Sequence, residues 1–152
     1  MYVKEENYMS NYVNYLEEIT NVEKSNKKLK KVIEVGSYLI VWAAAIMSFW
    51  FFVEDTDAMG YALMIFYFAL PITSFVVSLI IGKDKGWGKE KWFMTVFFGI
   101  MYMLAEYATF SLANMTAFDK INIPDFEMII PGVVISLVGL IIGIGIRTIK
   151  KK

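Results

Sequence analysis

The stretch Lys91–Met115, KWFMTVFFGIMYMLAEYATFSLANM, decides the fold. It is long enough to cross a bilayer, which takes about 20 apolar residues in a helix. Beyond its first residue, Glu106 is its only charged side chain. An ionisable group at that depth is costly and normally faces protein, where it has a partner. We therefore predict a membrane-spanning helix with one protein-facing carboxyl group.

The helical phase of the stretch supports this interpretation. Its small and polar side chains recur at spacings of 4, 3, 4, 3 and 4, which places them on one face of a helix. These residues are Thr95, Gly99, Tyr102, Glu106, Thr109 and Ala113. Bulky apolar residues occupy the remaining circumference. We therefore expect the apolar face of this helix to contact lipid and the polar face to contact protein.

Composition extends the membrane prediction to the whole chain of 152 residues. Apolar residues make up 57% of it, above the roughly 45–50% of soluble domains. The absence of Cys and His removes the commonest general base and the usual zinc ligands. No glycine-rich phosphate loop is present, and no span holds a pair of carboxylates for acid–base work. We predict a non-enzymatic protein without a cofactor or a bound metal.

Hydropathy predicts an all-α fold, a polytopic membrane protein with a four-helix transmembrane bundle and an amphipathic cytoplasmic N-terminal helix. The expected domains are residues 1–31, an amphipathic helix with a basic juxtamembrane segment, and residues 32–152, the transmembrane domain. The predicted spans are about 35–53, 58–82, 92–115 and 128–146. Pro71 lies in the middle of the second span, cannot donate a hydrogen bond to the carbonyl of Tyr67, and is expected to kink that helix.

An apolar seam with spacings of 4, 3, 4 and 3 runs along the N-terminal helix. It consists of Tyr8, Tyr12, Tyr15, Ile19 and Val22. The charged residues around the seam are five glutamates against Lys4 alone, whereas a helix that lies on anionic lipid shows Lys and Arg on its polar face. We therefore expect the seam to dock onto a protein partner or a second copy of the chain. Packing over the ends of its own bundle is the alternative.

Charge distribution predicts the topology. Basic residues dominate the segment before the first span, the loop at 83–91 and the tail, whereas acids dominate the other two loops. By the positive-inside rule both termini are cytoplasmic. The lysine run at 24–31 is read as this signal and not as a nucleic-acid site, and Trp87 and Trp92 fit the headgroup level. Lys/Ile/Asn-rich usage indicates a bacterial cytoplasmic membrane.

The fourth span carries a stripe of small residues, which lets helix backbones approach closely. The stripe consists of Gly132, Ser136, Gly139 and Gly143. Its neighbour is expected to be a helix of the same chain.

Counting helical rise from the centre of each span places several polar side chains at one depth. The candidate binding residues are Glu106, Tyr67, Ser48 and Tyr102. They form either a structural cluster, in which a protonated Glu106 donates to a carbonyl or shares a hydrogen with Tyr67, or a proton-coupled or cation site. The sequence favours the first option, and with it an accessory or regulatory subunit that associates with a protein partner or itself, over the second as the alternative. The second favours a small oligomeric transporter with Glu106 as its coupling or binding carboxylate.

Overall fold

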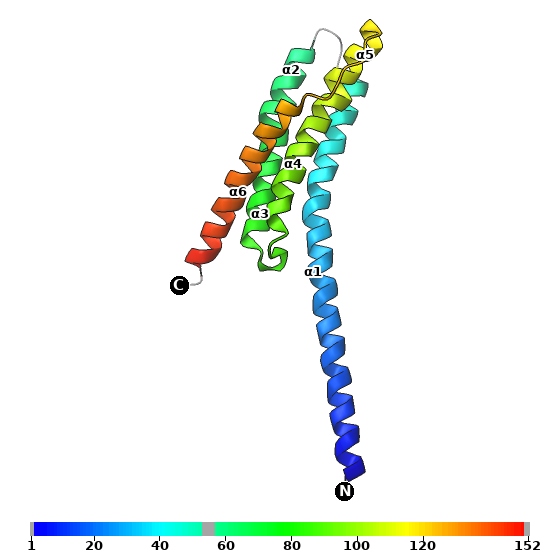
Figure 1. Cartoon of the computed structure of the whole chain (residues 1–152), viewed down its shortest axis with the longest axis vertical. Coiled ribbons are helices and arrows are strands. Elements are labelled where there is room, and N and C mark those ends of the chain that lie inside the picture. Colours follow the sequence, from blue (N-terminus) through cyan, green and yellow to red (C-terminus); the bar gives the residue numbers. More distant parts are fainter. Residues whose placement is uncertain (1, 53–56, 151–152) are drawn as a thin grey trace. The chain divides into compact units, whose positions relative to one another are not determined.

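The computed structural model describes residues 2–52 and 57–150, with side chains from residue 11 onwards. These ranges are predominantly helical and contain no strand. The elements in chain order are α1 (Tyr2–Phe52), α2 (Ala58–Ala62), η1 (Leu63–Ala69), α3 (Leu70–Lys83), η2 (Lys85–Trp87), α4 (Lys91–Glu106), η3 (Tyr107–Ser111), α5 (Leu112–Phe118), η4 (Phe126–Met128) and α6 (Ile129–Ile149) (Figure 1). Of the short elements, η1 and η3 are π-helical turns within longer helices, and η2 and η4 are 3₁₀ turns.

In the described ranges, four helices are long and apolar enough to cross a membrane. They cover Asn11–Phe52, Ala58–Lys83, Lys91–Phe118 and Phe126–Ile149. The predicted all-α membrane fold is confirmed, and these apolar helices identify an integral membrane protein in contact with lipid. The predicted N-terminal helix is not a separate element, because α1 continues without a break from Tyr2 to Phe52. Contacts nevertheless divide the chain into two compact units, Met1–Ile33 and Glu34–Lys152.

Within the second unit, α3 and α4 pack against α6, and Figure 1 shows the three helices side by side. The small-residue stripe makes this packing close. A Cβ added at Gly139 would lie 2.5 Å from the carbonyl oxygen of Phe75, and one added at Gly132 would lie 2.8 Å from the Cα of Gly99. The Ser136 hydroxyl lies 2.7 Å from that of Ser78. All four stripe residues are buried against helices of the same chain.

Residues 34–52 of α1 join the bundle through long aromatic side chains. The indole Nε1 of Trp42 donates to the carbonyl of Met101 at 2.7 Å, and that of Trp50 donates to the carbonyl of Ala108 at 2.9 Å. From α2, the Tyr61 hydroxyl donates to the carbonyl of Ala45 at 2.8 Å. Since hydrocarbon offers no competing water, such bonds between helices stabilise the arrangement.

Candidate functional site

A cavity of about 450 Å³ lies between the second, third and fourth spans. Its lining residues are Ala62, Phe66, Tyr67, Tyr102, Glu106, Phe110, Met128 and Pro131. They come from the half of the bundle that adjoins the acidic loops. Both π-helical turns contribute to the wall, η1 through Phe66 and Tyr67 and η3 through Phe110.

The proline in the second span explains the π-helical turn η1. Instead of the usual bond to the fourth residue back, the backbone N–H of Leu70 donates to the carbonyl of Ile65, the fifth residue back. In this register the carbonyl of Phe66 is the one that residue 71 would bond to. Pro71 has no N–H, so it cannot donate to that carbonyl. The hydroxyl of Tyr102 donates to that carbonyl instead. The sequence predicted that Pro71 deprives the carbonyl of Tyr67 of its backbone donor. Because the helix changes register, the carbonyl concerned is that of Phe66, one residue earlier.

Glu106 stands at the point where α4 passes into η3. The Ser111 hydroxyl donates to its two carboxylate oxygens, at 3.0 and 3.2 Å. These residues are five apart, a spacing that a π-helical turn brings towards one face of the helix. The predicted hydrogen bond with Tyr67 is not the one the structure shows. Sequence reasoning missed Ser111 because an unbroken α-helical phase turns it away from Glu106.

The structure brings together three of the four candidate binding residues. Glu106, Tyr67 and Tyr102 line the same cavity, with Tyr102 buried and Tyr67 71% exposed on its rim. Ser48 does not line it. The Ser48 hydroxyl donates to the carbonyl of Ala45 at 2.7 Å, on its own helix.

Aromatic rings and one carboxylate set the chemistry of the cavity. Phe66 packs edge-on against Tyr102, with ring centroids 5.6 Å apart, and lies 5.9 Å from Phe110. None of the lining residues is basic, so the lining supplies Glu106 with no counter-ion. Ring faces attract cations and a carboxylate attracts them more strongly. The arrangement is complementary to a positive charge carried on an apolar body.

A buried carboxyl group escaped the sequence analysis. Glu34, just before the predicted start of the first span, is 7% exposed and accepts a hydrogen bond from the indole of Trp87 at 2.6 Å. Trp87 is correspondingly buried, at 5% exposure. The residues are far apart in the sequence, so no local pattern pairs them. One turn after Glu34, the Tyr38 side chain is fully buried.

The N-terminal seam is exposed within its own unit. Tyr12, Tyr15, Ile19 and Val22 are between 41% and 61% exposed. The side chain of Tyr8 lies outside the residues whose side chains are described.

Comparisons with protein-family models, with curated proteins and with solved structures gave no match. The functional interpretation therefore rests on the geometry of the cavity and of the seam.

Proposed function

We propose that the chain is a small non-enzymatic membrane transporter that binds an organic cation in the cavity, with Glu106 as the binding carboxylate. The observation that supports this is a lone carboxyl group in an aromatic-lined space of about 450 Å³. Small-molecule sites are typically cavities of about 300–1,000 Å³, mostly apolar, with a few placed polar groups.

The charge of the ligand follows from the lining. A carboxylate away from water is costly unless a positive charge pairs with it, and Ser111 supplies only a neutral hydroxyl. Each favourable ring–cation contact adds about 0.5–2 kcal/mol. An anion would be repelled by Glu106 and would find no basic partner. The ligand is therefore a cation whose apolar part contacts Phe66 and Phe110.

The two π-helical turns support transport in addition to binding. Such turns are frequent at functional sites and are places where helices bend. Here they form two walls of the same cavity, and Pro71 weakens one of them. Glu106 exchanges a proton for the cation when the walls rearrange, which is the role that intramembrane carboxylates have in transporters.

Orientation and location form part of the proposal. Lysines precede the first span, occupy the loop at 83–91 and end the chain, so both termini are cytoplasmic. The cavity then lies in the outer half of the membrane. The Lys/Ile/Asn-rich composition supports a bacterial cytoplasmic membrane.

Binding of tetraphenylphosphonium, an apolar organic cation, to the detergent-solubilised protein tests the proposal. Glu106→Gln is expected to weaken binding at least about tenfold, which is about 1.4 kcal/mol. The matched control is Glu127→Gln, which removes an exposed carboxylate at the same end of the bundle and should leave the affinity unchanged. Equal affinities for Glu106→Gln and the unmodified protein would show that the cavity is not the cation site.

The exposed seam favours a second function, that of an accessory or regulatory subunit. An apolar helix face in water gains stability when a partner covers it. Under this function, Tyr12→Asp with Ile19→Asp would remove a co-purifying protein while the bundle stays folded. Unchanged co-purification would exclude the seam as a binding surface for another protein.

A further inference from the structure

The apolar seam continues past Val22 once α1 is known to run unbroken. Asn26, Leu29 and Ile33 follow it at spacings of 4, 3 and 4. In heptad notation the d positions are Tyr8, Tyr15, Val22 and Leu29, and the a positions are Tyr12, Ile19, Asn26 and Ile33. These eight residues, the extended seam, cover about 38 Å of helix at the standard rise per residue.

The extended seam lies in a unit that consists of one helix. In Met1–Ile33 the structure describes α1 and no other element. Leu29 and Ile33, like the four seam residues with described side chains before them, are exposed, at 60% and 61%. A single helix cannot bury its own apolar face, and most helical stability in proteins comes from such burial.

We infer that two copies of this chain pair through the extended seam as a parallel, in-register, two-stranded coiled coil. Asn26 carries the argument for a second copy. A single Asn at an a position fixes register and oligomeric state, because it hydrogen-bonds with the same Asn of the partner helix. A shift of one heptad would set Asn26 against Ile19 or Ile33 and leave a polar group unpaired.

The neighbouring positions agree with two parallel strands. β-branched Ile19 and Ile33 at a, with Leu29 at d, follow the pattern of two-stranded coiled coils, whereas Val22 at d and the three tyrosines do not add to it. Two chains inserted into one membrane in the same orientation also point their N-terminal helices the same way. This inference adds an assembly to the proposed function without depending on it, since one copy contains the whole cavity.

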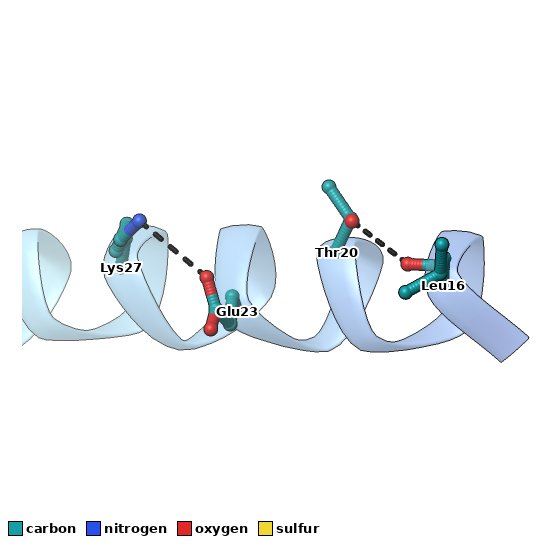
Figure 2. Close-up of polar contacts among 4 residues, drawn as sticks. All are labelled: Leu16, Thr20, Glu23 and Lys27. Atoms are coloured by element: carbon teal, nitrogen blue, oxygen red, sulfur yellow. Dashed lines mark hydrogen bonds and ion pairs between the residues drawn. The ribbon is translucent and has the colours of Figure 1, made fainter.

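Most charged side chains of this segment lie away from the interface of the coiled coil. Four of the lysines lie at the outward b, c and f positions: Lys24, Lys27, Lys28 and Lys31. One like-charge contact remains in the dimer, between Glu18 at g and the partner helix's residue at e, which is Glu23. Figure 2 shows Lys27 turned towards Glu23 of its own helix, at 3.8 Å, which reduces that repulsion. The extended seam thus pairs at a modest electrostatic cost.

Cysteine cross-linking tests the inference, because the chain has no Cys of its own. Val22→Cys, at d, and the matched control Lys24→Cys, at f, are placed one at a time in the full-length protein in membranes and oxidised. The two cysteines at d approach to the distance a disulfide needs, so Val22→Cys should cross-link at least about tenfold more than Lys24→Cys. The product should have twice the mass of the chain. Equal cross-linking at both positions, or a product with a different protein, would overturn the inference.

The role of Asn26 is tested in the Val22→Cys background. Asn26→Asp sets two negative charges against each other in the core and should reduce cross-linking about tenfold. Asn26→Leu removes the register signal but keeps an apolar core, so the dimer should still cross-link. Unchanged dimer cross-linking in Asn26→Asp would contradict an Asn26 pair in the core. Thermal stability of each variant shows separately that the bundle is folded.

Discussion

At the scale of single residues, two hydrogen bonds hold the cavity wall around Glu106. The carboxylate accepts from Ser111, and Tyr102 donates to the carbonyl of Phe66. Both hydrogen bonds follow from the π-helical register, and Glu106 also lines the cavity. Glu106 therefore has a structural partner and, in the proposed function, also a binding role, and substitutions should separate the two.

Glu106→Gln and Glu106→Ala should differ in stability but not in transport. Glutamine has nearly the same size and can accept from Ser111, so the variant should unfold at the same temperature as the unmodified protein. Alanine leaves the buried Ser111 hydroxyl unpaired and should cost about 1 kcal/mol. The measurement is thermal unfolding in detergent, alongside cation uptake into vesicles.

Neither Gln nor Ala can exchange a proton, so both variants should abolish uptake. A Glu106→Gln protein that transports normally would return Glu106 to a purely structural role.

At the scale of elements, the stripe on α6 determines how closely the spans approach. Gly139 and Gly143 face the backbone of α3, and Gly132 faces α4. Without a hydrophobic driving force between helices in lipid, van der Waals contact of this kind holds the bundle together. The cavity wall at Pro131 adjoins this contact, so α6 positions the site as well as the fold.

Gly139→Ala and Gly145→Ala make the same change on the same helix with opposite expectations. A Cβ at Gly139 meets the Phe75 carbonyl at 2.5 Å, whereas at Gly145 there is no described heavy atom within 4 Å. Gly139→Ala should destabilise the protein by about 1–3 kcal/mol, as overpacking does, and Gly145→Ala should not destabilise it. The measurement is the thermal unfolding temperature of each purified variant. Equal unfolding temperatures would contradict the close approach of α6 and α3.

At the scale of the whole molecule, topology relates the cavity and the seam to the two sides of the membrane. If the lysine-rich segments are cytoplasmic, the cavity adjoins the outer surface and the extended seam lies in the cytoplasm. Ligand binding and assembly of two copies would then occur on opposite sides of the bilayer.

Single cysteines test this topology in intact cells. Cysteines at Asp57 and Lys120, in the acidic loops, should react with an impermeant thiol reagent added outside. Those at Lys24 and Lys85 should react only after the cells are opened, because basic segments stay on the cytoplasmic side. Labelling of Lys24→Cys in intact cells would reverse the orientation.

The sequence by itself determined the four spans, the small-residue stripe and the candidacy of Glu106. Each is a local property, since apolar length and helical periodicity can be read without knowing what a residue touches. For the same reason three cavity residues, Glu106, Tyr67 and Tyr102, were found before the structure.

Only the tertiary structure decided how these residues are used. The π-helical register moved the proline's effect from Tyr67 to Phe66 and brought Ser111 to Glu106. Folding also paired Glu34 with Trp87, from segments far apart in the chain. Helical phase is regular until a turn changes register, and a contact between distant segments leaves no periodic trace, so neither could be predicted from local pattern.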